Sequence, residues 1–263
     1  MKIRVVCDAC LTESMAEVSN TEGTEDDSSS QDIEGFAELG SDGIVNTQCS
    51  RGHSGRLFLR AHLFEVLFDV SLMAYTDGYR RETISGIAAT YERFVELIVR
   101  VILSGRGVTG AGVADCWKEV ARQSERQLGA FLLLYLSEFG TAPRVLCGKS
   151  IALRNQVTHN GYIPHDLEVE EYASDVLAAI RETVGVVAEK YRGHFQKVRL
   201  EAEPQHVAGS PRPIGYTYPT AICLSAALQL WTVPDFASAV AHVEKFRDQI
   251  GRASCRERVL ASV

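Results

Sequence analysis

The spacing of hydrophobic residues between Leu57 and Tyr191 constrains the fold more than any other feature of the chain. In this stretch apolar residues recur at positions i, i+3, i+4 and i+7, which is the spacing of an amphipathic α-helix. Glycine, proline and asparagine residues divide the pattern into segments. The helices that we expect lie at residues 57–73, 81–103, 113–139, 143–159 and 167–191, with two shorter ones at 220–231 and 234–249. The main part of the chain is therefore expected to be an all-α helical bundle.

Two short-spaced pairs of zinc-binding residue types precede the helical region. Cys7 and Cys10 form a C-x2-C pair, and Cys49 and His53 form a C-x3-H pair. Zinc in structural sites prefers four thiolate or imidazole ligands in a tetrahedron. We therefore expect residues 1–56 to form a small zinc-ribbon β module with one structural Zn²⁺ bound by these four side chains. A redox-active pair of Cys7 and Cys10 stays open as an alternative.

A long acidic insertion separates the two pairs. Ten of the 34 acidic residues lie between Leu11 and Ser50, a segment without lysine or arginine. Residues 19–35 are rich in Ser, Thr, Glu and Asp and contain almost no apolar residues, so we expect a solvated or disordered loop there. The net charge of −7 comes from this insertion, because basic residues outnumber acidic ones by three in the rest of the chain. The acidic charge therefore does not argue against a polyanionic partner such as RNA.

A polar motif stands at the end of the fourth expected helix. Arg154 and Asn155 are followed by three residues and then by His159, and the pair Asn160-Gly161 ends the helix. The spacing from arginine to histidine carries little information alone. The looser pattern of an arginine, four to six residues and a histidine also matches Arg56 with His62 and Arg199 with His206.

The context of the motif resembles the HEPN superfamily, a group of all-α domains whose signature is an arginine, a polar residue and a histidine. Residues 77–82 and 91–94 are similar to the paired first helices of such domains. The resemblance extends over residues 57–191 at the level of pattern. It implies a dimer whose interface builds the active cleft. It also implies a metal-independent endoribonuclease, because many members have this activity and act as toxins or antiviral effectors.

The residue types of the motif suit RNA cleavage without a metal. Such cleavage needs a base for the 2′-hydroxyl proton, an acid for the leaving oxygen and a cation for the phosphorane charge. His159 can serve as base or acid, Arg154 can bind phosphate oxygens, and Asn155 can orient the histidine or bind substrate. Five helical positions turn the chain by ~140°, so Arg154 and His159 do not share a face. Two helices that meet across a two-fold axis would bring both pairs into one cleft. Glu82 and Glu92 are weaker candidates for contacts there.

These features predict a metal-independent endoribonuclease of the HEPN type, a toxin or antiviral defence effector with RNA as its substrate. The predicted catalytic residues are Arg154, Asn155 and His159. We expect a homodimer, with an antitoxin or another defence protein as a further partner. The alternative is a non-catalytic zinc-ribbon and HEPN module that binds nucleic acid or protein. A redox-responsive regulator based on Cys7 and Cys10 is a third, weaker hypothesis.

The sequence divides into four parts on this interpretation. They are a zinc ribbon at 1–56, a HEPN-like domain at 57–195, a C-terminal helical extension at 196–249 and a tail at 250–263. The tail resembles a translated sequencing adapter, and we assign it no function. No apolar run reaches the ~18 residues that a membrane span needs, and the start of the chain has no apolar signal core. We therefore expect a cytoplasmic protein without a membrane partner. The remaining cysteines of the helical region are expected to be buried free thiols: Cys116, Cys147 and Cys223.

Overall fold

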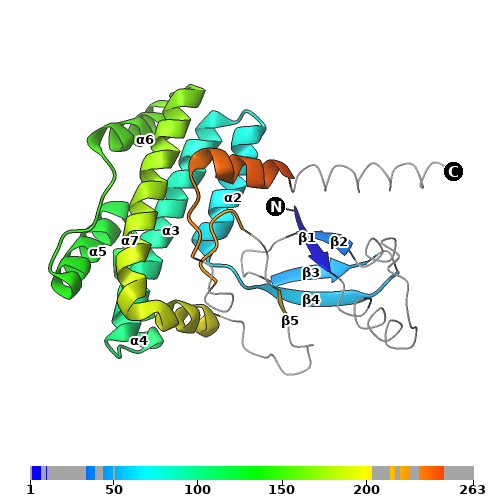
Figure 1. The fold of residues 1–263 in the computed structure, drawn as a ribbon, viewed down its shortest axis with the longest axis horizontal. Coiled ribbons are helices and arrows are strands. Elements are labelled where there is room, and N and C mark those ends of the chain that lie inside the picture. The colour runs from blue at the N-terminus through cyan, green and yellow to red at the C-terminus, as the bar shows by residue number, and fades with distance from the viewer. Residues whose placement is uncertain are drawn as a thin grey trace. The chain divides into compact units, whose positions relative to one another are not determined.

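The computed structural model of the chain (Figure 1) describes residues 2–6, 10, 34–38, 44–49, 51–202, 214–216, 220–225 and 231–245. The chain divides into two compact units. One unit consists of Met1–Arg60 with Glu203–Tyr218, and the other consists of Ala61–Ala202 with Pro219–Val263. Cys7, residues 19–33 of the acidic insertion and the tail at 250–263 lie outside the described residues. The predictions for them therefore stay predictions.

The first unit contains two small sheets. Its strands are β1 (Lys2–Val6), β2 (Glu34–Glu38), β3 (Ile44–Gln48), β4 (Ser54–Leu59) and β5 (Ile214–Tyr216). Strands β1 and β2 form an antiparallel pair, and β4 pairs antiparallel with β3 and parallel with β5. Strand β1 lies at the start of the chain, within the β module expected at 1–56. Among the described side chains of β3 and β4, the buried ones are Val45, Leu57, Phe58 and Leu59.

Three expectations for this unit are wrong. Residues 57–59 lie in β4 rather than in a helix, because Leu57 pairs with Val45 and Phe58 pairs with Ile44 on β3. A short apolar run is compatible with a helix and with a buried strand, and the pairing decides between them. The boundary between the units therefore falls after Arg60 instead of after residue 56. The loop expected at 19–35 also ends earlier, because β2 begins at Glu34.

The second unit is a bundle of helices around a central one. Its long helices are α2 (Leu63–Thr76), α3 (Arg80–Gly105), α4 (Gly110–Val120), α5 (Ser124–Phe139), α6 (Gly148–Asn160) and α7 (Asp166–Glu201). Helix α3 contacts α2, α5, α6 and α7, and α7 runs beside it in Figure 1. The α3 side chains without exposed surface include Ile84, Ile87, Phe94, Ile98 and Ile102. None of the described helices combines the length and the apolar character needed to cross a membrane. The packing of the other helices around α3 confirms the helical bundle expected for this unit.

Several expected helix boundaries in the bundle are wrong. The single helix expected at 113–139 is two helices, α4 and α5, separated by residues 121–123. The helix expected from 143 begins only at Gly148. The last long helix, expected from residue 167, begins at Asp166 with His165 as its N-cap, and the Glu168 side chain accepts the His165 backbone N–H. It also continues to Glu201, although Tyr191, where we expected it to end, has non-helical backbone angles that mark a kink.

The expected C-terminal helical extension at 196–249 is only partly helical. Residues 196–201 belong to α7, and residues 236–245 form a helix. Residues 220–225 do not, because Cys223 pairs with Thr232 in an antiparallel bridge. The three cysteines expected to be buried are also not buried: Cys116 and Cys147 are exposed and Cys223 is half-buried.

Two buried carboxylates on α2 explain why residues 220–225 do not form a helix. Asp69 Oδ1 accepts the backbone N–H of Ala221 at 3.0 Å, and Glu65 Oε1 accepts that of Leu224 at 2.6 Å. The other oxygen of Glu65 accepts the backbone N–H of His62 at 2.6 Å. Burial raises the pKa of Glu65 to about 8 and that of Asp69 to about 7, and it lowers the pKa of His62 to about 3.

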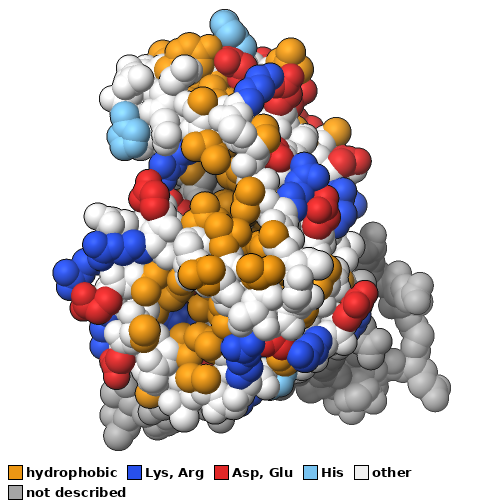
Figure 2. All heavy atoms as spheres, turned by 90° about the vertical axis from the view of Figure 1, so that its left-hand side faces the viewer, with side chains coloured by type: hydrophobic (Ala, Val, Ile, Leu, Met, Phe, Trp, Pro, Cys, Tyr) orange, Lys and Arg blue, Asp and Glu red, His pale blue; other side chains and the backbone are white. Residues whose placement is uncertain are grey.

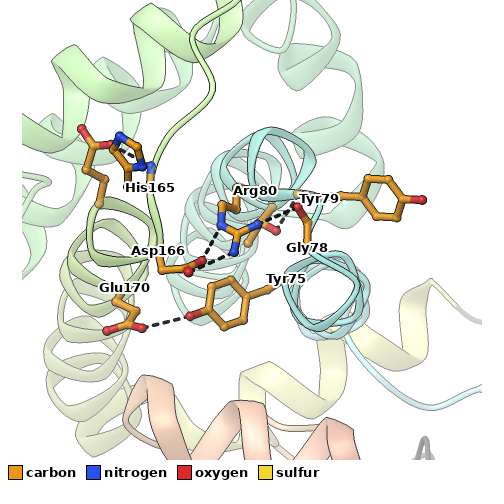
Figure 3. A network of polar contacts seen from close by, with 9 residues as sticks. Tyr75, Gly78, Tyr79, Arg80, His165, Asp166 and Glu170 are labelled. Atoms are coloured by element: carbon orange, nitrogen blue, oxygen red, sulfur yellow. Dashed lines mark hydrogen bonds and ion pairs between the residues drawn. The ribbon is translucent and has the colours of Figure 1, made fainter.

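A surface network joins the turn between α2 and α3 to the start of α7 (Figure 3). Gly78 adopts a left-handed conformation with φ of 81°, and its carbonyl accepts Arg80 Nη1 at 3.0 Å. Arg80 also forms a two-point ion pair with Asp166, with Nη2 2.9 Å from Oδ2. Tyr75 donates to Glu170 at 2.9 Å. These contacts hold α7 against α2 and α3, and α3 and α7 contribute to the candidate site.

Candidate functional site

Helix α6 carries the Arg-Asn-x3-His motif and is held at both ends. At its start, Asp175 of α7 accepts the backbone N–H of Cys147 and the hydroxyl of Ser150, each at 2.8 Å. Burial opposes ionisation of Asp175, but these hydrogen bonds and Arg144 outweigh it and keep the pKa of its carboxyl below the usual value. At its end, Gly161 adopts the left-handed conformation with φ of 68°, as the sequence predicts.

The side chain of Arg154 is positioned by three partners. Its Nη2 donates to Glu92 Oε1 on α3 at 3.1 Å and to Ser124 Oγ at the start of α5 at 3.4 Å. Its Nη1 donates to Asn155 Oδ1 at 3.1 Å. The Arg154 side chain is 25% exposed and that of Glu92 is 31% exposed. The guanidinium is therefore oriented by side chains from α3, α5 and α6 but still reaches solvent.

A cavity of about 310 Å³ lies beside Arg154 and Asn155. Helices α3, α5, α6 and α7 and the segment before α6 contribute its walls, which are mainly apolar. The apolar walls include Tyr91, Val95, Leu128, Leu132 and Tyr172, and the polar groups include Glu92 and Ser124. Figure 2, which views the molecule from the left of Figure 1, shows hydrophobic side chains gathered in the middle of the visible face. Leu133 and Leu136 of α5 and Ile151 of α6 are among the exposed apolar residues of the bundle.

His159 lies apart from this arrangement. It is exposed in the last turn of α6 and does not line the cavity. The structure thus brings Arg154 and Asn155 together with Glu92 and does not bring His159 to them, which agrees with the ~140° expected from the helical spacing. Glu82, the other acidic candidate, is not among the cavity residues and lies beside Arg81 on the surface.

The sequence reasoning missed Ser124 as a partner of Arg154. Ser124 is the first residue of α5, and we expected it to lie in the middle of one long helix. The polar run Arg122-Gln123-Ser124 is the one sequence signal of a helix start at this point.

The first unit brings together three of the four expected metal ligands. Cys10 Sγ lies 3.7 Å from Cys49 Sγ and 3.2 Å from His53 Nδ1. Both cysteines are buried, and the sulfur–sulfur distance is well beyond the about 2.05 Å of a disulfide. Gly52, in the left-handed region with φ of 84°, closes the turn between Cys49 and His53. This group could hold a metal ion. The fourth expected ligand, Cys7, lies outside the described residues.

Comparisons of the chain with protein-family models, with curated proteins and with solved structures found no match. The resemblance to the HEPN superfamily therefore depends on the residues of the chain itself. The same holds for the expected zinc ribbon.

Proposed function

We propose that this chain is a metal-independent endoribonuclease of the HEPN type, which acts in the cytoplasm as a toxin or antiviral effector. The observation that carries the proposal is the orientation of Arg154 by Glu92, Ser124 and Asn155 at the edge of a cavity. A guanidinium that is oriented in advance and still reaches solvent is suited to stabilise the charge that develops on a phosphate. RNA is the substrate in this proposal.

The proton transfers belong to His159 in the proposed mechanism. An imidazole can remove the proton of the 2′-hydroxyl as a base or protonate the leaving 5′-oxygen as an acid near neutral pH. His159 is exposed, so a substrate or a second protein chain can approach it. One chain does not bring His159 to Arg154. We therefore propose a homodimer in which two copies of α6 face each other across a two-fold axis.

The Cys/His group serves as a structural zinc site in this proposal. Two sulfurs bound to one tetrahedral zinc lie about 3.8 Å apart, and a sulfur and a nitrogen lie about 3.6 Å apart. The distance between the two sulfurs, 3.7 Å, agrees with this geometry, and the distance of 3.2 Å from Cys10 Sγ to His53 Nδ1 is slightly shorter. The zinc would hold a ribbon that binds RNA or a partner such as an antitoxin.

The experiment that tests the nuclease compares His159→Ala with Thr158→Ala, its exposed neighbour on α6. Labelled single-stranded RNA is incubated with zinc-loaded protein in buffer without Mg²⁺. We expect the wild type and Thr158→Ala to cleave, and His159→Ala to lose at least ~100-fold in rate, the size typical of a lost acid–base group. Circular dichroism and gel filtration check folding and dimerisation of each variant. Full cleavage by a folded His159→Ala protein would refute the proposed role.

One observation favours the alternative, a non-catalytic module that binds nucleic acid or protein. Arg154 already pairs with the carboxylate of Glu92, so a phosphate must compete with this ion pair. The same experiment separates the two functions. A binding module retains RNA or a protein partner, but the wild type produces no cleavage products in the absence of divalent cations.

A further inference from the structure

We propose that the cavity beside Arg154 binds one unstacked base of the RNA strand, with guanine preferred, and so sets where the strand is cut. This inference rests on the proposed nuclease function and names the substrate feature that the same site recognises. It concerns the cavity formed by α3, α5, α6 and α7 within the helical unit.

The size and walls of the cavity suit a planar aromatic group. Its volume of about 310 Å³ is at the lower end of the range for small-ligand sites. Two tyrosines, Tyr91 and Tyr172, and aliphatic side chains such as Val95 and Leu132 line it. Single-stranded RNA is commonly recognised through bases that leave the stack and lie against aromatic side chains and arginine planes. An apolar pocket of this size therefore fits one base rather than a folded protein segment.

The polar groups at the cavity select the kind of base. Glu92 presents a carboxylate, which accepts hydrogen bonds and does not donate them when ionised. One of its oxygens takes Arg154 Nη2, and within the described part of the chain the other has no hydrogen-bond donor. Among the four RNA bases, only guanine has two adjacent donors, N1–H and N2–H₂, on one edge. A guanine edge therefore matches the carboxylate of Glu92 better than the other bases do.

The position of Arg154 links the cavity to a nucleotide rather than to a free aromatic compound. Arg154 lines the same cavity and still reaches solvent, so a phosphate next to the bound base can approach its guanidinium. Arginine binds phosphate oxygens through a planar set of N–H donors. An apolar pocket with a cation at its edge and a carboxylate in its wall is thus complementary to a nucleotide in three separate respects.

Leu132 and Leu133 provide a matched pair of variants. Leu132 lines the cavity, whereas Leu133, the next residue on α5, is 72% exposed and does not line it. Tryptophan at position 132 should fill the space, and tryptophan at position 133 should extend into solvent. Binding is measured by isothermal titration with 2′-O-methyl hexanucleotides that differ in one base, because they lack the attacking hydroxyl. Guanosine 5′-monophosphate is the probe for a free nucleotide.

We expect the wild type to bind the guanine-containing hexanucleotide ~10-fold more tightly than the others, the order of discrimination of one bidentate contact. Leu132→Trp should remove this preference and Leu133→Trp should keep it. In unmodified RNA the wild type should cut beside guanine, and Leu132→Trp should cut without a preference.

Three results would either overturn the inference or distinguish the base pocket from the proposed nuclease activity. Equal binding of all four hexanucleotides excludes a base pocket, whether or not the protein cleaves RNA. Binding of the monophosphate without any preference among hexanucleotides assigns the cavity to a free nucleotide and overturns the RNA assignment. Guanine-dependent binding that Leu132→Trp removes supports the base pocket, and if the wild type then cleaves no RNA, the proposed nuclease alone has failed.

Discussion

The replacement of Asp69 by asparagine should stabilise the helical unit above neutral pH. Asp69 is 1% exposed, and its Oδ1 accepts the backbone N–H of Ala221. Burial raises its pKa from an ordinary 3.8 to about 7, so the folded protein binds a proton more tightly than the unfolded chain does. A group of this kind favours folding at low pH, and the benefit disappears as the pH rises from about 4 to 7. At 1.36 kcal/mol for each pKa unit, the loss is ~4 kcal/mol.

Asparagine keeps the hydrogen bond and removes the charge. Its amide oxygen can accept the Ala221 N–H, so Asp69→Asn should equal the wild type near pH 4 and exceed it by up to ~4 kcal/mol near pH 8.5. The free energy of unfolding is measured by urea denaturation, followed by circular dichroism at 222 nm, at intervals between these two pH values. The wild-type curve should fall with pH, and the curve of the variant should fall less.

Glu65 provides the control for this reasoning. Both of its oxygens accept backbone N–H groups, from His62 and from Leu224. An amide at this position has one oxygen and one NH₂ group, so Glu65→Gln turns a donor toward one of these N–H groups and leaves that group without an acceptor. We expect a smaller gain than for Asp69→Asn, or a loss. A variant Asp69→Asn that is no more stable than the wild type near pH 8.5 would refute the argument from buried charge.

Three further outcomes are expected. Cys49→Ser should lower the bound zinc from about one to less than ~0.5 per chain by elemental analysis, whereas the exposed Cys116→Ser should leave it unchanged. Glu92→Gln should reduce kcat/KM for RNA cleavage by at least ~10-fold, because Arg154 loses the carboxylate that orients it, and Glu82→Gln should not. Tyr91→Phe should change the free energy of unfolding by less than ~1 kcal/mol in chemical denaturation. The reason is that the hydroxyl of Tyr91 is buried and, among the described residues, has no hydrogen-bond partner.

The sequence predicted those elements whose signals are local. The regular spacing of apolar residues predicted α3 almost completely, and Asn160-Gly161 predicted the end of α6. Residues 57–59 were assigned to a helix because their assignment to a strand depends on pairing with β3, which a local pattern does not contain. Residues 220–225 were also assigned to a helix. There the buried carboxylates of α2 bind the backbone N–H groups from about 150 residues away, and these tertiary contacts override the local preference.

The candidate metal ligands were predictable for a chemical reason. Few side chains bind zinc, so two short-spaced pairs stand out even when a long insertion separates them. The structure brings Cys10 to Cys49 and His53 across 39 and 43 positions of the chain. Such a separation is tolerated because the entropy cost of closing a loop grows only with the logarithm of its length. The types of these residues therefore indicated the candidate metal-binding group, which their spacing along the chain alone would not have done.

The partners of Arg154 were not predictable in the same way. Glu92 and Ser124 lie 62 and 30 positions away, and carboxylates and hydroxyls are common on helix surfaces. What the spacing did predict is the separation of Arg154 from His159, and this has a consequence for function. Asp175 anchors the start of α6, and Glu92 and Ser124 orient Arg154. Val157 is the last buried residue of α6, so His159 lies beyond the packed part of the helix. A catalytic His159 therefore needs groups from outside its own chain, and in the proposed homodimer a second copy of α6 would supply the arginine.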